Sequence, residues 1–280
     1  MQNILINGQA ASQIDVRDRG FQYGDGVFET IACKNGQLEF WQAHMQRLAD
    51  ACERLNLPAV PAQQWLDDIA ALQPQGEAVI KLILTRGVSG RGYAYSDSEQ
   101  QPLRVCALYP WPDYPPQNQQ GINAIICKTP VSMNAALAGI KHLNRLDNVL
   151  ARNEWRDPHI AEGLMLDHQQ HVIEGTMSNV FCVLDDQLYT PSLDRCGVRG
   201  VMREQIIQLA QSQGITLNEI EISQQNFLQM DEIFVSNSLI GIWPVSRIVD
   251  QPERQYTTSM AQQLQRQLQQ LDVHRALEAN

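Results

Sequence analysis

The 280-residue sequence lacks the signatures of membrane insertion and of export. It has no apolar run of the roughly 20 residues that a helix needs to cross a bilayer. Its first ten residues, MQNILINGQA, do not combine a basic region with a following apolar stretch. We therefore expect a cytoplasmic protein without a membrane partner.

Common motifs for metals and nucleotides are also missing. The six cysteines are scattered and form no CxxC pair, so we expect reduced, mostly buried thiols and no metal site. Neither GxxxxGKS/T nor a GxGxxG after a strand occurs, which argues against a bound nucleotide.

Positive charge is scarce and spread along the chain. There are 21 Lys and Arg residues against 31 Asp and Glu, which gives a formal net charge of −10. Nucleic acid is therefore not an expected partner. An acidic protein that binds an anionic small molecule must gather cations locally, so individual lysines and arginines become informative.

Helical and strand patterns mix without regular alternation, which predicts an α+β fold. The proline-rich stretch YPWPDYPPQNQQ excludes a helix interior or central strand and indicates a linker. We expect a smaller N-terminal domain at 1–110, a linker at 111–121 and a larger domain at 122–280. Inside the larger domain, a helix is predicted with a buried stripe formed by Leu143, Leu146, Val149 and Leu150.

Lys141 follows a small, apolar lead-in, Ala138-Gly139-Ile140, just before that helix. A lysine is nucleophilic only when its amine loses a proton near neutral pH, which apolar surroundings or a nearby cation such as Arg145 favour. The alternative is an ordinary lysine with a packed stem and a solvated amine.

Glu174 lies in VIEGTMSNVF and is either a plain turn residue or the partner of a heteroaromatic nitrogen. Pyridoxal phosphate requires a lysine, an acid at its ring nitrogen and donors for its phosphate. The candidate donors are Arg47, which shares a helix face with His44, the backbone N–H groups of Val201 and Met202, and the hydroxyl of Ser238. A surface arginine and an ordinary helix start are the alternatives for the first two.

Five separated segments together resemble a known family. HMQRL, GIKHLNRLDNVLARNE, EGTMSNVF, GVRGVMREQI and DEIFVSNSLIGIWPV follow the order and spacing of the fold-type IV pyridoxal-phosphate enzymes. The resemblance implies a two-domain fold like that of D-amino acid aminotransferase, and a homodimer. It also implies that Lys141 carries the cofactor, that Glu174 meets the pyridine nitrogen, and that the phosphate is held by Arg47, Val201, Met202 and Ser238.

Within the family, KHLNRLDNVL and RGVSGRGYAYS are most similar to the aminodeoxychorismate lyases. This resemblance implies a carbon–oxygen-cleaving lyase that eliminates pyruvate from 4-amino-4-deoxychorismate and yields 4-aminobenzoate for folate biosynthesis. Because YGDGVFET also resembles the D-amino acid aminotransferases, a D-amino acid or branched-chain aminotransferase is the alternative.

Four residues are candidates for substrate binding. Phe28 stands where D-amino acid aminotransferase has a tyrosine, and it lacks the hydroxyl that would contact a carboxylate. Arg91 and Tyr93, in TRGVSGRGY, are suited to a carboxylate, although a solvated hairpin tip is equally compatible. Asn144 either touches substrate or cofactor, or caps the helix that follows.

Overall fold

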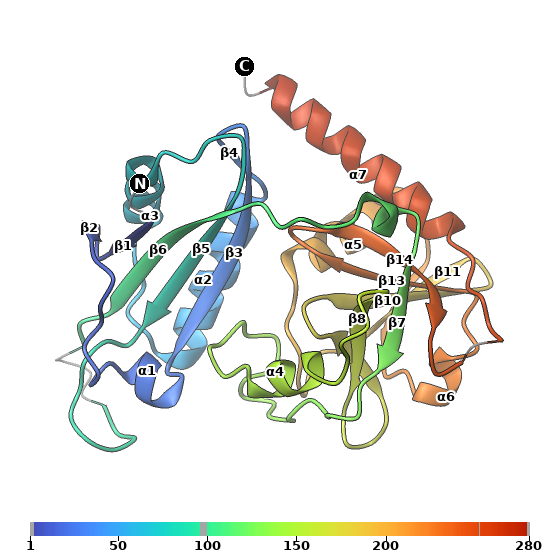
Figure 1. Cartoon of the computed structure of the whole chain (residues 1–280), viewed down its shortest axis with the longest axis horizontal. Coiled ribbons are helices and arrows are strands. Elements are labelled where there is room, and N and C mark those ends of the chain that lie inside the picture. Colours follow the sequence, from blue (N-terminus) through green and yellow to red (C-terminus); the bar gives the residue numbers. More distant parts are fainter. Residues whose placement is uncertain (1–2, 96–99, 252, 279–280) are drawn as a thin grey trace. The chain divides into compact units, whose positions relative to one another are not determined.

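The computed structural model describes residues 3–95, 100–251 and 253–278. The chain divides into two compact units (Figure 1). Unit 1 comprises Met1–Asp113 and Ile140–Arg145, and unit 2 comprises Tyr114–Gly139 and Leu146–Asn280. Both units combine helices with a sheet, which confirms the predicted α+β class.

Unit 1 contains an antiparallel sheet in the order β2-β1-β6-β5-β3-β4. Its strands are β1 (Ile4–Ile6), β2 (Gln9–Ala10), β3 (Gly26–Lys34), β4 (Gln37–Leu38), β5 (Glu77–Thr85) and β6 (Leu103–Pro110). The two long strands β3 and β5 pair over their whole length, from Gly26↔Thr85 to Lys34↔Glu77. This register determines which side chains of the two strands share a face.

Three helices belong to unit 1: α1 (Arg19–Tyr23), α2 (Trp41–Leu55) and α3 (Ala62–Leu72). One face of the sheet forms the core with α2 and α3, through residues such as Ile31, Leu48 and Trp65. Because side chains alternate along a strand, Phe28 and Thr30 of β3 lie on the opposite face and are only half-buried. This second face is therefore available for function.

Unit 2 contains a sheet in the order β12-β11-β10-β13-β14-β7-β8-β9. Its strands are β7 (Ile122–Ile126), β8 (Ile160–Leu166), β9 (Val172–Gly175), β10 (Asn179–Leu184), β11 (Gln187–Pro191), β12 (Leu217–Ile220), β13 (Glu232–Asn237) and β14 (Gly241–Ile248). An additional pairing of β9 with β10, Asn179↔Glu174, closes the strands from β10 to β9 into a barrel. Inside unit 2, the rings of Phe181 and Phe234 stack with centroids 5.0 Å apart.

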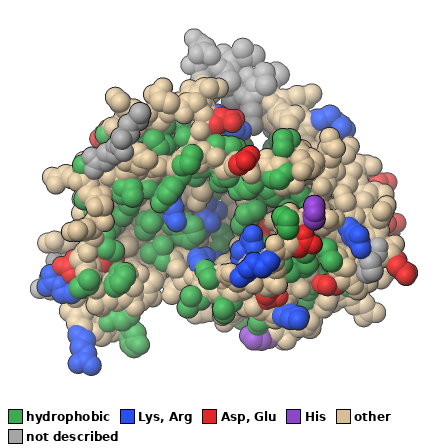
Figure 2. Space-filling view, viewed as in Figure 1, with side chains coloured by type: hydrophobic (Ala, Val, Ile, Leu, Met, Phe, Trp, Pro, Cys, Tyr) green, Lys and Arg blue, Asp and Glu red, His purple; other side chains and the backbone are tan. Residues whose placement is uncertain are grey.

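The helices of unit 2 are η1 (Pro116–Gln119), α4 (Leu146–Arg152), α5 (Val201–Ser212), α6 (Gln224–Phe227) and α7 (Ser259–Glu278). Part of the predicted linker thus forms the 3₁₀ helix η1, with Pro116 at its first position, where proline's missing N–H is tolerated. No helix among the described residues is long and apolar enough to span a bilayer. On the face shown in Figure 2, Lys and Arg side chains lie at separate places with acidic side chains among them.

The predicted buried stripe of α4 is wrong. Leu146, Val149 and Leu150 are 75%, 52% and 60% exposed, whereas Ala151 is completely buried. The helix begins only at Leu146, because the preceding residues are extended and Leu143 donates its N–H to Gly26 instead. This late start leaves a helix of seven residues that packs on β8 with a different face from the one that its leucines suggest.

The division between the two units falls between Asp113 and Tyr114, within the stretch 111–121 that was predicted to be a linker. Residues Ile140–Arg145, however, belong to unit 1, although the sequence analysis placed them in the domain at 122–280. The physical reason is that Ile140 is 2% exposed within the core of unit 1. That the larger domain at 122–280 binds the cofactor stays a prediction.

Candidate functional site

Lys141 is fixed in unit 1 by backbone pairing. Its carbonyl accepts a hydrogen bond from Phe28 N at 3.0 Å, and Leu143 N donates to Gly26 O at 3.0 Å. Lys141 Nζ lies 4.3 Å from the centroid of the Phe28 ring. The apolar neighbour of this amine is therefore a ring on β3, while Ile140 packs in the core.

A second ammonium group lies near the same ring. Lys81 Nζ is 5.5 Å from the centroid of Phe28. Lys81 and Ile83 lie two residues apart on β5, and Ile83 pairs with Phe28. Lys81 and Phe28 therefore lie on the same face of the sheet, opposite the core. The sequence analysis missed this residue, although a lysine within the apolar strand AVIKLIL was a usable signal. Lys81 thus adds a positive charge to this face, which suits an anionic group.

Asn144 joins the Lys141 segment to the turn between α1 and β3. Its Nδ2 donates to Gly24 O at 3.1 Å. Gly24 has a left-handed backbone conformation with φ of 67°, and an added Cβ would lie 2.6 Å from Asn144 Oδ1. Because α4 begins only at Leu146, Asn144 does not directly precede the helix as a cap. Its predicted contact with substrate or cofactor stays a prediction.

Arg47 lies on α2 and forms an ion pair with a buried carboxylate. Its Nε donates to Glu29 Oε1 at 2.8 Å, and its Nη2 contacts the other carboxylate oxygen. His44 Nδ1 lies 2.7 Å from Glu29 Oε2. Burial opposes ionisation of Glu29, but the charges and hydrogen bonds of Arg47 and His44 outweigh it and lower its pKa to about 2. The guanidinium predicted to bind phosphate is therefore oriented by Glu29.

Arg91 and Tyr93 lie in the loop between β5 and β6. Both side chains are exposed, and that of Tyr93 is 84% exposed. The Tyr93 ring packs edge-on against Tyr23, with centroids 5.5 Å apart. The structure thus places these predicted carboxylate ligands on a surface loop of unit 1.

Glu174 is buried at the point where the barrel of unit 2 closes. It is 4% exposed, and its Oε2 accepts a hydrogen bond from Val198 N at 2.8 Å. Gly139 donates to Gly197 O at 2.8 Å and accepts from Arg199 N at 3.1 Å. The loop before α5 is therefore held by Glu174 and by the chain two residues before Lys141.

The first turn of α5 presents backbone donors. Gly200 is the N-cap and supplies no side-chain hydrogen bond, so the N–H groups of Val201 and Met202 lie at the positive end of the helix dipole. The side chains of Val201 and Met202 are each 5% exposed, which leaves the backbone as the group offered to a ligand. Asn179 Nδ2 ties the loop to β10 through Val198 O at 2.7 Å.

Ser238 lies in the turn between β13 and β14. Asn179 pairs with both Glu174 and Ser236, so Ser238 follows at the same end of the barrel as Glu174. Asn237 Oδ1 accepts hydrogen bonds from Leu239 N at 2.8 Å and from Ile240 N at 3.0 Å. The backbone amides of Leu239 and Ile240 therefore already have an acceptor within this turn.

Glu162 is a second functional candidate that the sequence analysis missed. It is fully buried on β8, where its pKa is raised by burial despite its hydrogen bonds. Its oxygens accept from Thr176 Oγ1 at 2.6 Å and from Ser178 Oγ at 2.7 Å. Glu162 therefore holds the turn that follows Glu174. The signal in the sequence was a lone charge in the strand IAEGLML.

The chain belongs to the amino-transferase class IV family, whose model matches residues 26–248. The aminodeoxychorismate lyase of Vibrio harveyi is 38% identical over 87% of this chain and 90% of the relative. A putative branched-chain-amino-acid aminotransferase of Methanocaldococcus jannaschii is 30% identical over 88% of this chain and 87% of the relative. The crystal structure of 4-amino-4-deoxychorismate lyase from Pseudomonas aeruginosa is 41% identical, with a TM-score of 0.90, over 95% of this chain and 98% of that chain. These findings confirm the predicted fold-type IV architecture.

The ion pair of Glu29 predicts a defined acid sensitivity. Its folded-state pKa is about 2 against an ordinary value of 4.5, so the unfolded chain binds a proton more readily. The stabilisation, on the order of 3 kcal/mol, is present above pH 4.5 and is lost as the pH falls toward 2. Urea unfolding at several pH values should show the gap between wild type and Glu29→Gln narrowing over this window. Glu53→Gln, at an exposed position of α2, is the control. A gap that stays constant with pH contradicts the assignment.

Proposed function

We propose that this protein is a pyridoxal-phosphate-dependent aminodeoxychorismate lyase, which releases pyruvate from 4-amino-4-deoxychorismate and forms 4-aminobenzoate for folate biosynthesis. The observation that carries the proposal is the 41% identity and TM-score of 0.90 to the lyase from Pseudomonas aeruginosa, over nearly the whole of both chains. The aminotransferase of Methanocaldococcus jannaschii, at 30% identity, is less similar to this chain.

The donor set of the chain fits pyridoxal phosphate chemically. Lys141 supplies the amine for the cofactor's aldehyde, and buried Glu174 supplies a carboxylate for its ring nitrogen. The phosphate is assigned to the α5 amides of Val201 and Met202, which have no side-chain cap, with the Ser238 hydroxyl and the Arg47 guanidinium. When bound, the cofactor supplies an electron sink that stabilises negative charge on the neighbouring carbon of the substrate.

Lys141 has two tasks in this proposal. Its amine would hold the cofactor before the substrate binds, and its free Nζ would remove the proton from the substrate carbon that bears the nitrogen. Loss of this proton would allow the adjacent carbon–oxygen bond to break with release of enolpyruvate, which becomes pyruvate when one proton is returned to it. Because the remaining ring becomes aromatic, elimination is downhill, and the protein mainly supplies orientation and a base.

The substrate has two carboxylates, and unit 1 offers groups for them. Phe28, Arg91, Tyr93 and Asn144 are the proposed substrate-binding residues. Phe28 shapes the surface beside Lys141 Nζ, and Lys81 adds a cation at the same ring. Arg91 on the loop after β5 can form a bidentate pair with a carboxylate.

Two narrower proposals concern the protein's setting. A reducing, cytoplasmic location is supported by six cysteines that are all buried and free in the structure. A homodimer is supported by the resemblance to fold-type IV enzymes.

The alternative function is a D-amino acid or branched-chain aminotransferase, because such enzymes share the family and the proposed cofactor residues. A relative named as a putative branched-chain enzyme aligns over 88% of this chain. The two functions differ in their second substrate, since an aminotransferase must pass the amino group to a 2-oxo acid.

We predict catalytic release of pyruvate and 4-aminobenzoate from 4-amino-4-deoxychorismate when no 2-oxo acid is added. Both products should appear in equal amounts and exceed the enzyme concentration many times. The measurement is coupled detection of pyruvate together with the fluorescence of 4-aminobenzoate. Turnover that requires an added 2-oxo acid contradicts the lyase assignment and supports the aminotransferase.

We predict that Lys141→Ala abolishes turnover, because it removes both the attachment point of the cofactor and the base. Borohydride reduction followed by peptide mass spectrometry should locate the cofactor on Lys141 in the wild type. Lys128→Ala, which removes an exposed lysine of unit 2, should keep normal activity and labelling. Normal turnover by Lys141→Ala is incompatible with the assigned role.

We predict that Glu174→Gln retains the cofactor but reacts much more slowly, by at least about 100-fold, because a neutral amide does not hold the ring nitrogen protonated. Absorbance spectra should show stoichiometric cofactor in the variant, while stopped-flow measurements report the slower proton removal. A variant that turns over at the wild-type rate shows that Glu174 does not serve this nitrogen.

A further inference from the structure

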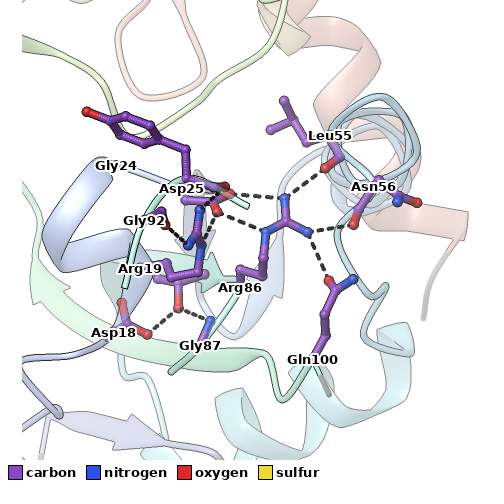
Figure 3. Close-up of polar contacts among 12 residues, drawn as sticks. Asp18, Arg19, Gly24, Asp25, Leu55, Asn56, Arg86, Gly87, Gly92 and Gln100 are labelled. Atoms are coloured by element: carbon purple, nitrogen blue, oxygen red, sulfur yellow. Dashed lines mark hydrogen bonds and ion pairs between the residues drawn. The ribbon is translucent and has the colours of Figure 1, made fainter. Parts of the chain in front are cut away.

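Two buried arginines and a partly buried aspartate form a group of three charges in unit 1 (Figure 3). Asp25 accepts a hydrogen bond from Arg19 Nε at 2.8 Å. It also accepts from Arg86 Nε at 2.9 Å and from Arg86 Nη2 at 3.1 Å. Both arginine side chains are 4% exposed, and these bonds lower the pKa of Asp25 although burial opposes its ionisation. One carboxylate thus orients two guanidinium groups.

Arg86 anchors this group to the rest of unit 1. Its Nη1 donates to Asn56 O at 2.7 Å and to Gln100 Oε1 at 2.9 Å, and its Nη2 donates to Leu55 O at 2.9 Å. With its two bonds to Asp25, every N–H of the guanidinium has an acceptor. The ring of Tyr95 covers the guanidinium, with its centroid 3.6 Å from Arg86 Cζ.

Arg19 faces the other way, toward the loop that contains Arg91. Its Nη1 donates to Gly92 O and its Nη2 to Tyr93 O, each at 2.8 Å. Its backbone N–H also donates to Gly87 O at 2.9 Å, near the start of the loop. Arg19 therefore holds both ends of the segment that includes Arg91, with its guanidinium fixed by Asp25.

Arg19 holds the loop by its backbone carbonyls, while the side chains of Arg91 and Tyr93 remain exposed. The two carbonyls that Arg19 holds belong to the residues directly after Arg91, and the side chains of Arg91 and Tyr93 are exposed. An exposed loop that must become ordered on binding loses affinity through conformational entropy. A loop that is already fixed avoids this loss.

We propose that Arg19, oriented by Asp25 and backed by Arg86, is a positioning residue that presets the Arg91–Tyr93 loop for a carboxylate of the substrate. The proposal deepens the proposed function, because it rests on Arg91 and Tyr93 as substrate ligands. Arginine is required because its planar fork reaches one carboxylate and two carbonyls together, which a lysine ammonium does not.

The structural part is tested without substrate, by limited trypsin digestion of the full-length protein. Mass spectrometry follows cleavage of the bond after Arg91 in wild type and in Arg19→Lys. We expect about tenfold faster cleavage in Arg19→Lys, because the carbonyls of Gly92 and Tyr93 lose their charged donor. The matched control is Arg17→Lys, two residues away, whose side chain is 69% exposed and pairs with Asp15. Equal cleavage rates in wild type and Arg19→Lys overturn the proposal.

The functional part is tested by kinetics with 4-amino-4-deoxychorismate. We expect Arg19→Lys to raise KM about tenfold and to change kcat less than about twofold. The reason is that the loop is proposed to bind the substrate, whereas Lys141 is proposed to remove the proton. Arg19→Lys added to the double variant Arg91→Ala/Tyr93→Ala should raise KM no further, since the contacts that Arg19 positions are then already absent. Additive effects, or a loss confined to kcat, overturn the positioning role.

Tyr95→Leu covers the case in which Arg19→Lys does not fold, because it leaves both arginines in place and removes the ring whose centroid lies 3.6 Å from Arg86 Cζ and 5.9 Å from Arg19 Cζ. It should shift cleavage and KM in the same directions by smaller factors, and no shift in either overturns the proposal. If wild type does not release pyruvate, the lyase assignment fails by itself, whereas the digestion result still decides whether Arg19 orders the loop.

Discussion

The placement of Lys141 depends on backbone pairing between its segment and the start of β3. The neighbouring strand β4 covers only the far end of β3, at Cys33 and Lys34, which leaves the first residues of β3 with unpaired edge groups. The segment satisfies them through Phe28 N and Gly26 O. As a result the Lys141 amine lies 4.3 Å from the centroid of the Phe28 ring of β3.

Carboxylates with little or no exposure orient the segments that carry the proposed site residues. Asp25 and Glu29 of unit 1 each orient arginines, whereas Glu162 of unit 2 is held by hydroxyl and amide donors. Such groups add little net stability compared with apolar residues of the same size, but removal of one partner leaves a buried charge or donor uncompensated. Here these carboxylates act mainly by orienting other groups, because each one fixes a loop or a guanidinium in one orientation.

Patterns among neighbouring residues predicted structural features that depend on nearby residues, but not those that depend on contacts between distant segments. The sequence analysis placed Arg47 and His44 on one helix face, and both lie on α2, which buries one side against the core of unit 1. The stripe of α4 was wrong because the helix start is set by pairing with β3, more than a hundred residues away in the sequence, which periodicity does not encode. The motif residue Arg47 was identified, but its partner Glu29 was not, since their ion pair depends on packing of α2 against β3.

The lyase and the aminotransferase are not distinguished by the residues proposed to hold the cofactor. A lyase and an aminotransferase of this family both need an amine, an acid at the ring nitrogen and phosphate donors, so Lys141 and Glu174 do not discriminate between them. They diverge after proton removal, when one substrate has a leaving group on the next carbon and the other does not. What selects the substrate must therefore be the groups that recognise its carboxylates and ring. In the proposal these are the sheet face at Phe28 and Lys81 and the loop of Arg91, both in unit 1. The proposed function thus assigns specificity to the sheet face and its arginine-held loop rather than to the residues proposed to hold the cofactor.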